Sequence, residues 1–523
     1  MLNTDKSIKT IIIIAIFIVL NLISIQLFTR IDITRGKRYS ISDYSKNMVE
    51  NLDDKLTIKG YFSKNIPSPY NTVQQQVKDK LSEYKAYANH YFQYEFVTPE
   101  DKQEFVNKAR SYGIPQVRVN AVEEDQAVIK NVVMGLVIMY EDRSETIPVV
   151  ENTENLEYAI SSKINKLINK NLPTIGFLQG HGEIDFNNNL QQVKKQLEEN
   201  YNLKAVNLAE SQNALDEVEV LVIPGPKEEI PLKEKYLIDQ FIMQGKKVLF
   251  LVENVKANLQ SQRPSAEFYS HNLHDWFKNY GFDVNKNLVY DMNCKNIQVQ
   301  QMVGNTRHIS FMRYPFFTII RNLNKENMIV KELDQISFIF ASSIDTTLAK
   351  PLKLDISTLA ASSERSGLQS DRLNISISSA ENLEYNEKNI PLAAIIRGEF
   401  NSYFNNFEIP DTVNFETSGM LNSSPENRIM VVGDAEFLNP NFMDKSNLLF
   451  FANSIDWLAQ EKGLIQIRSK EIGAPPLKEV NAGIKNTIKF IIKFLPTLLI
   501  IIFALIMWQF KKRRYARIRR YYQ

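Results

Sequence analysis

The chain has 523 residues, of which 44% are hydrophobic and 23% are charged, a balance typical of folded globular proteins and not of disordered ones. Its formal charge is +2, but once the seven cations of the tail and the net +1 of the first 29 residues are set aside, residues 30–510 carry about −6. A mildly acidic body is a poor binder of nucleic acid, so we expect no nucleic-acid partner. The single cysteine, Cys294, excludes an internal disulfide.

Two uncharged apolar runs lie near the two ends of the chain. Residues 10–29 contain no charged residue, and about 20 such residues suffice to cross a bilayer core as a helix. Residues 494–510 form a slightly shorter run, with Trp508 where an interfacial aromatic residue would lie. The sequence therefore predicts two transmembrane helices in the cytoplasmic (inner) membrane, with the lipid bilayer as a partner. Because the first run lacks a small-residue cleavage site, we interpret it as a retained anchor and not as a signal peptide.

The distribution of cations predicts the orientation. Seven Lys and Arg residues, and no acid, follow the second run within residues 511–523, which marks a cytoplasmic tail. With two spans, residues 1–9 are then cytoplasmic too, and the body between the spans is extracytoplasmic (periplasmic). Four cations after the first run, at 30, 35, 37 and 38, favour the opposite orientation. A cytoplasmic body that hangs from two helices is the alternative.

Residues 30–172 alternate between strand and helix patterns. We expect strands at 56–62, 91–97 and 116–122, a hairpin at 132–140 and 145–150, and helices at 73–88, 99–112 and 156–167. This order, with Pro115 before the third strand, resembles a thioredoxin-like fold. Where such a fold would hold its redox pair, residues 63–66 contain no thiol. Dithiol chemistry is therefore excluded, and we expect a scaffold.

Residues 173–470 open a second α/β unit. Strands are expected at 174–179, 204–208, 218–223 and 247–252, alternating with helices at 190–197 and 231–245. Apolar strands between amphipathic helices predict a parallel sheet covered on both faces, of flavodoxin-like or Rossmann type. Residues 355–386 are Ser-rich and weakly periodic, which we interpret as irregular surface. A strand at 428–432 and a helix at 447–458 follow, and residues 471–493 are expected to be a juxtamembrane linker.

Two loops at the expected ligand edge of this sheet are the candidate binding site. Loops that follow the carboxyl ends of parallel strands form that edge. The candidate residues are Gly180, His181, Gly182 and Glu183 after the first strand, and Pro224 and Gly225 after the third. We expect His181 and Glu183 to be exposed, so that replacing them changes stability by only about 0.5 kcal/mol. A glycine-flanked polar turn without function is the alternative.

Catalytic and metal-binding interpretations have less support. His181 and Glu183 could act as acid and base of a membrane-anchored envelope enzyme. One histidine and one glutamate are too few ligands for a metal site, and we interpret His271 and His274 as a helix start and not as a metal pair. The chain contains no Gly-x-x-x-x-Gly-Lys-Ser/Thr, Gly-x-Gly-x-x-Gly or Gly-x-Ser-x-Gly motif. We therefore expect no nucleotide, no cofactor and no catalytic residue, and energy would have to come from a partner.

A set of short motifs spans nearly the whole chain. They are RYSIS at 38–42, LTIKGYF at 56–62, LQGHGE at 178–183, VLVIPGP at 220–226, VVGDAEFL at 431–438 and NSIDWL at 453–458, between the two apolar runs. With this set the chain resembles the auxiliary component of the ABC-type transport system associated with bacterial gliding motility (GldG-like). The resemblance implies a non-enzymatic or substrate-engaging subunit that works beside a separate ATPase and a separate permease. It implies no catalytic residue and no particular ligand.

Overall fold

The computed structural model describes residues 40–459 apart from nine short gaps, together with a few residues outside that range. The gaps are 98–100, 124–125, 152–154, 170, 212, 260–263, 304–305, 381 and 407–418, and the outlying residues are 16, 467, 493–495, 503–505 and 507–512. Met1–Ile472 and Gly473–Gln523 form separate compact units. Of the two predicted spans, the described residues include only residue 16 of 10–29, and residues 494–495, 503–505 and 507–510 of 494–510. Within the described part, no helix is long and apolar enough to cross a bilayer.

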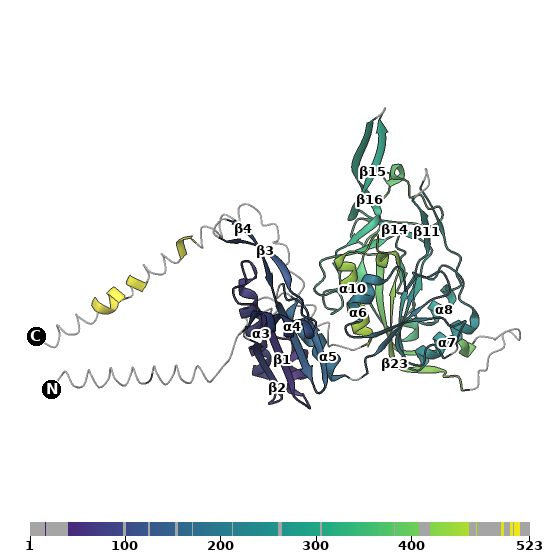
Figure 1. The fold of residues 1–523 in the computed structure, drawn as a ribbon. Coiled ribbons are helices and arrows are strands. Elements are labelled where there is room, and N and C mark those ends of the chain that lie inside the picture. The colour runs from purple at the N-terminus through teal and green to yellow at the C-terminus, as the bar shows by residue number, and fades with distance from the viewer. Residues whose placement is uncertain are drawn as a thin grey trace, which may run out of the picture. The chain divides into compact units, whose positions relative to one another are not determined.

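The first sheet has four strands in the order β2-β1-β5-β6 (Figure 1). β1 (Leu56–Phe62) is parallel to β2 (Phe92–Val97) and antiparallel to β5 (Met134–Tyr140), which pairs with β6 (Arg143–Ile147). The predicted hairpin of residues 132–150 is thereby confirmed. The helices of this region are α2 (Asp43–Glu50), α3 (Val73–Tyr87), α4 (Lys102–Ser111) and α5 (Leu156–Ile168).

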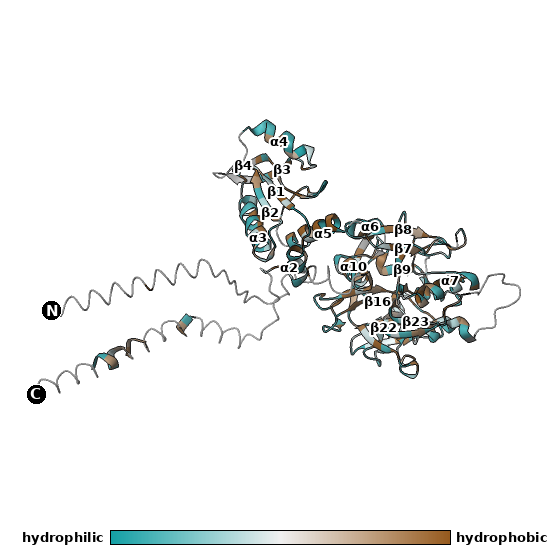
Figure 2. Ribbon diagram, turned by 90° about the horizontal axis from the view of Figure 1, so that it is seen from below, coloured by the Kyte–Doolittle hydropathy of each residue, from teal (hydrophilic) through white to brown (hydrophobic). Residues whose placement is uncertain are grey.

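Alternation along the strands explains why helices cover both faces of this sheet. On β1, Ile58 packs with apolar residues of α3 and α5, whereas Tyr61 packs with Phe105 of α4. Successive residues of a strand point to opposite faces, so one strand supplies both cores. In Figure 2 the helix α5 is mostly brown, while α3 and α4 show long teal stretches. This agrees with α3 and α4 each burying an apolar face and exposing the opposite, polar face to solvent.

The predicted strand at 116–122 does not join this sheet. β3 (Val117–Glu123) pairs instead with β4 (Gln126–Val132) in a separate antiparallel ladder. Only two residues separate Glu123 from its partner Gln126. Such a short connection favours a local hairpin over a more distant strand partner.

The second sheet has eight strands in the order β17-β20-β22-β23-β10-β9-β7-β8. Five of them are parallel: β7 (Thr174–Leu178), β8 (Asn202–Val206), β9 (Val218–Pro224), β10 (Lys247–Leu251) and the end of β23 (Ser423–Val432). Three antiparallel strands extend the sheet beyond β23: β22 (Pro391–Asn401), β20 (Asp355–Ala361) and β17 (Asn322–Leu323). The structure is therefore mixed α/β.

Strand β20 corrects the interpretation of residues 355–386 as irregular surface. It pairs with β22, and its residues Leu359 and Ala360 are fully buried. The register shifts twice, between Thr358 and Ala360 and between Ala360 and Ala361. Such bulges interrupt the alternation of side chains that reveals a strand in sequence.

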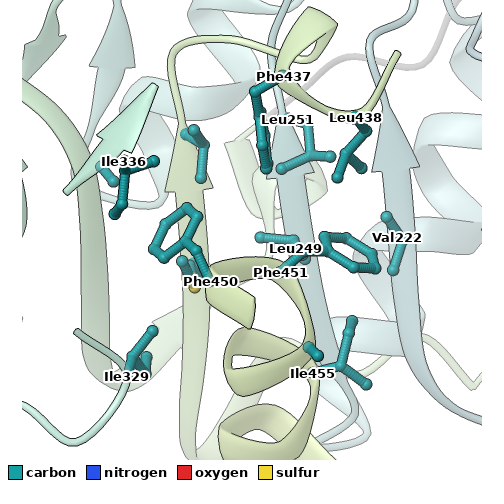
Figure 3. Packing of buried hydrophobic residues seen from close by; sticks show 14 of the residues in the cluster. Val222, Leu249, Leu251, Ile329, Ile336, Phe437, Leu438, Phe450, Phe451 and Ile455 are labelled. Atoms are coloured by element: carbon teal, nitrogen blue, oxygen red, sulfur yellow. The ribbon is translucent and has the colours of Figure 1, made fainter. Parts of the chain in front are cut away.

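Helices cover both faces of the second sheet. α6 (Gln191–Leu197) and α10 (Lys445–Ala459) share one core with the sheet, and α7 (Leu232–Met243) and α8 (His274–Asn279) share the other. Figure 3 shows Phe451 of α10 beside Leu249 of β10 and Val222 of β9, and Phe450 and Ile455 of the same helix belong to the same core. The parallel strands are buried on both faces, which explains their continuous apolar sequences.

The remaining elements are short, except for one long hairpin. β15 (Cys294–Val303) and β16 (Thr306–Ile320) extend away from the second sheet (Figure 1), and β16 also pairs with β18 (Ile336–Ile339). The others are β11 (Val255–Asn258), β12 (Ser265–Phe268), β13 (Asp283–Val284), β14 (Leu288–Asp291), β19 (Ile344–Asp345), β21 (Ser366–Gln369) and α9 (Ile377–Ala380).

Candidate functional site

The carboxyl ends of the parallel strands β7, β9, β10 and β23 bring four loops to one edge of the second sheet. The loop after β7 and the loop after β9 are joined directly, because Lys227 N and Glu228 N both donate to the carbonyl of His181, at 2.8 and 3.0 Å. Ile184 N also donates to Pro224 O, at 3.0 Å. The structure thus places the two predicted loops side by side. Whether they bind a ligand stays a prediction.

Glycines allow these loops to approach one another. Gly182 and Gly225 have φ of +77° and +75°, a left-handed conformation that disfavours other residues, and Gly180 has φ of +129°. A Cβ on Gly225 would lie 2.6 Å from the Cβ of Ala435. The loop after β9 can therefore contact the loop after β23 only because position 225 is glycine.

His181 and Glu183 are buried, contrary to the expectation of an exposed turn. Their side chains are 7% and 1% exposed. His181 Nδ1 lies 3.0 Å from Glu183 Oε1, and its Nε2 lies 3.2 Å from Oε2 of Glu234 in the first turn of α7. Glu183 also accepts from the backbone N–H of His181, at 2.6 Å. The ring therefore connects the loop after β7 to α7.

This arrangement favours the charged form of His181. Burial by itself lowers the pKa of His181, but the hydrogen bond and charge of Glu183, aided by Glu234, outweigh it and raise the pKa above 6.5. Both ring nitrogens already face a carboxylate. The ring consequently has no nitrogen left to exchange a proton with a substrate, and its geometry is that of a structural ion pair.

Two further buried acids of this edge were missed in the sequence. Glu253 follows β10 and is 2% exposed, and Asp434 follows β23 and is 1% exposed. Asp434 accepts from the backbone N–H of Ile339 and of Glu436, each at 2.8 Å, whereas Glu253 accepts from Ala435 N at 3.4 Å. The available signal was an acid two residues after the end of an apolar strand, as in VVGDAEFL.

Burial shapes the electrostatics of these two acids. It raises the pKa of Glu253 well above its usual range, and the nearby Asp434 carboxyl adds to the effect. Burial raises the pKa of Asp434 in the same way. A nearby cation, Lys227, partly offsets this, and its Nζ lies 3.5 Å from Glu436 Oε1. The edge therefore combines buried carboxyls whose pKa is raised with the nearby cation Lys227.

His271 and His274 lie beside this edge, and α8 begins at His274 as predicted. His271 Nε2 is 2.6 Å from Asn254 Oδ1, and His274 Nδ1 is 2.8 Å from Asp283 Oδ1. Burial, with the positive charge of His274, lowers the pKa of His271 to about 4. Across the described residues, no group of three or more His, Cys, Asp or Glu side chains could hold a metal ion.

Comparisons with known proteins identify two regions. Residues 172–461, which contain the second sheet and its edge, match the model of a family described as an ABC-type uncharacterized transport system. Residues 35–139 match a domain of unknown function (DUF7088). The chain is 25% identical to an uncharacterized protein of Borreliella burgdorferi over 522 residues, which covers 95% of this chain and 96% of that protein.

Among solved structures, the chain is similar to the mmIFT52 N-terminal domain, with a TM-score of 0.34 and 14% identity, over 55% of this chain and 97% of that one. A likeness this weak adds nothing to the argument about function. The family match covers more than half of the chain and includes every candidate residue at the sheet edge. The chain belongs to the family of the ABC-type uncharacterized transport system.

Proposed function

We propose that the protein is a non-enzymatic auxiliary subunit of an ABC-type transport complex. The observation that supports this most directly is the family match over residues 172–461. The absence of a Walker A motif from the sequence agrees with a subunit that takes its energy from a separate ATPase and acts with a separate permease. A role in gliding motility is part of the proposal, and rests on the set of motifs named above.

The proposal includes a fold and a location. The strand order β8-β7-β9-β10-β23 supports a flavodoxin-like arrangement, and the order β2-β1-β5-β6 supports a thioredoxin-like one. Both regions would be extracytoplasmic and held at the inner membrane by residues 10–29 and 494–510. The apolar composition of those two runs and the cations after the second support this location.

The contact surface for a partner or ligand is proposed to be the edge formed by the loops after β7 and β9. Because His181 and Glu183 are buried, they position these loops, and the accessible groups are Gly182, Lys227 and Glu228. The buried ion pair would hold the loops of this surface in a fixed conformation. Loops on a rigid sheet are a common location for such contacts.

The envelope-enzyme alternative has less support at His181 and Glu183, since both nitrogens of the ring face carboxylates. Glu253 is the group that an enzyme would use, because a buried carboxyl with a raised pKa can act as a general acid. It has no open nucleophile or base partner among the contacts described above. We therefore favour the subunit over the enzyme.

Affinity purification from native membranes tests the proposal. A tagged chain should bring down an ABC ATPase and a permease. The charge reversal Glu228→Arg at the sheet edge should reduce their recovery several-fold. Glu198→Arg reverses an exposed charge at the C-terminus of α6, before β8 and thus at the opposite edge, and should leave recovery unchanged. Stoichiometric ATP binding by the purified chain alone would contradict the proposal.

A further inference from the structure

A hollow of about 600 Å³ lies at the carboxyl end of β1, within the region of the first sheet. Its walls come from the loop after β1, the first half of α4, the residue before β3 and the second half of β4. Small-molecule sites in proteins usually enclose about 300–1,000 Å³, so the hollow has the size of a ligand site. The family match at 172–461 does not include it.

The floor of the hollow is apolar. Phe105 and Val106 of α4 and Val132 of β4 line it and are 3–6% exposed. At the rim, Ile129 is 69% exposed, although it is a large aliphatic side chain. Covering Ile129 would remove apolar surface from water, which is favourable. An occupant with an apolar part would gain that stabilisation.

The polar part of the lining is cationic. Three lysines, Lys64, Lys102 and Lys130, line the hollow, and among the described residues that line it there is no Asp or Glu. Among the described residues, neither Lys64 nor Lys102 lies within ion-pair distance of a carboxylate. The side chains of Asn65, Gln116 and Asn131 add amide groups. Lys64 and Lys102 beside one hollow attract an anion, and lysine commonly contacts phosphate.

The local backbone keeps this lining in place. Ser63 N donates to Val133 O at 3.0 Å, and Val133 N donates to Ser63 Oγ at 2.9 Å. These two bonds hold the loop after β1 against the end of β4. The N-terminus of α4 is already capped, because Asp101 Oδ1 accepts from Glu104 N at 2.7 Å. The anion would therefore be bound by the lysine side chains and not by the end of the helix.

From this geometry we infer that the hollow binds a small organic anion, a phosphate or carboxylate group carried on an apolar body. The lysines hold the anionic group at the rim, and the apolar body lies over Phe105, Val106 and Ile129. The site occupies the place where a thioredoxin-like fold would hold its redox pair. A chain without thiols there uses the same concave surface for binding.

Calorimetry on the full-length protein in a non-ionic detergent tests the inference with phenyl phosphate, benzoate, inorganic phosphate and benzyl alcohol as probes. Phenyl phosphate or benzoate should bind once per chain. Inorganic phosphate, which lacks the apolar body, should bind at least tenfold more weakly, and uncharged benzyl alcohol should not bind. Equal binding of phenyl phosphate and inorganic phosphate would show that the site binds free phosphate. It would overturn the inference that the ligand carries an apolar body.

Matched variants locate the binding. The double variant Lys64→Gln/Lys102→Gln should weaken phenyl phosphate binding at least tenfold. Lys78→Gln/Lys108→Gln removes the same charge from exposed positions of α3 and α4 outside the hollow, and should weaken it less than twofold. Ile129 is exposed, so Ile129→Ser should leave the fold intact. This variant should weaken the binding of phenyl phosphate but not the binding of inorganic phosphate. No binding by any anionic probe, or equal losses in both double variants, would refute the site.

Discussion

At the scale of single residues, His181 is the side chain whose role changed most between sequence and structure. Its ring lies between the carboxylates of Glu183 and Glu234, and so ties the end of β7 to the start of α7. Removing one partner of a buried ion pair leaves the other charges uncompensated. We predict that His181→Gln lowers the free energy of unfolding by about 3 kcal/mol at pH 6.

The pH dependence of this loss has a definite sign. The pKa of His181 is raised in the folded state, so the ion pair contributes fully below pH 6.5 and its contribution disappears as the pH rises through the folded-state pKa. The difference between wild type and His181→Gln should therefore shrink between pH 6 and pH 9 in urea unfolding. His90→Gln, at an exposed histidine, is the control and should show little difference. A difference that is constant with pH would contradict the ion pair.

His271 should respond to pH with the opposite sign. Burial lowers its pKa to about 4, and the positive charges of His274, Lys286 and Lys235 add to this. Below pH 6.5, His271 binds a proton in the unfolded chain but not in the folded chain, so the free energy of unfolding falls between pH 6.5 and pH 4. We predict that His271→Gln removes roughly 2 kcal/mol of the loss that wild type shows between pH 7 and pH 5. The same acid sensitivity in both proteins would contradict a buried neutral His271.

At the scale of elements, α10 depends on its apolar face. Phe451 is 1% exposed and lies over the strands that contain Val222 and Leu249 (Figure 3). Truncation of a buried phenylalanine leaves a cavity, and costs about 3–5 kcal/mol. Phe451→Ala should therefore lower the melting temperature markedly. Leu449→Ala, a half-buried position on the same helix, should cost clearly less, and equal losses would contradict this packing.

Gly433 shows how closely the loop after β23 approaches its neighbour. A Cβ at this position would lie 2.0 Å from the carbonyl oxygen of Ser342, and Ser342 N donates to Gly433 O at 2.7 Å. This bond holds the backbone of Ser342 next to Gly433, so the Ser342 carbonyl has little room to move aside. Gly433→Ala should therefore destabilise the second sheet by about 3 kcal/mol or more, as overpacking and strain do.

Gly60 provides the comparison, because a Cβ there would meet the ring of Phe96 at 2.7 Å. That ring is only half-buried and can turn away. Gly60→Ala should therefore cost less than Gly433→Ala, as thermal unfolding of the two variants would measure. If Gly433→Ala is as stable as wild type, the close contact with Ser342 is wrong.

Elements also show what the sequence could predict. The apolar runs TIGFL and VEVLVIP, which precede Gln179-Gly180 and Gly225, gave the places of β7 and β9, and these strands are confirmed. The adjacency of their loops followed from parallel pairing. The burial of His181 did not follow, because its second carboxylate, Glu234, lies 53 residues later in the chain. β20 was missed because two bulges interrupt its alternation.

At the scale of the whole molecule, the candidate site contains more than any local motif indicated. Two of its buried acids, Glu253 and Asp434, follow strands that are neighbours in the sheet but about 180 residues apart in the chain. Only the pairing of β10 with β23 brings them together. A single sequence gives the strands, whereas the order of distant strands depends on tertiary contacts.

Orientation in the membrane is the prediction that concerns the whole chain. Residues 511–523 contain seven cations and no acid, which would have to cross the bilayer if the tail were outside. Protease added to spheroplasts should therefore digest the body between residues 30 and 493 and spare a tag placed after Gln523. A protected body with a digested tag would establish the alternative, a cytoplasmic body.

Charge variants make this test specific. Neutralising the four cations at 511–514 with glutamine should invert a fraction of the molecules, because the remaining bias then competes with the cations at 30, 35, 37 and 38. Neutralising the four cations at 30, 35, 37 and 38 instead removes the same charge from the segment that follows the first run. That change should leave the orientation unaltered, since these cations oppose it. If the second variant inverts and the first does not, the cations after the first run set the orientation, and the body faces the cytoplasm.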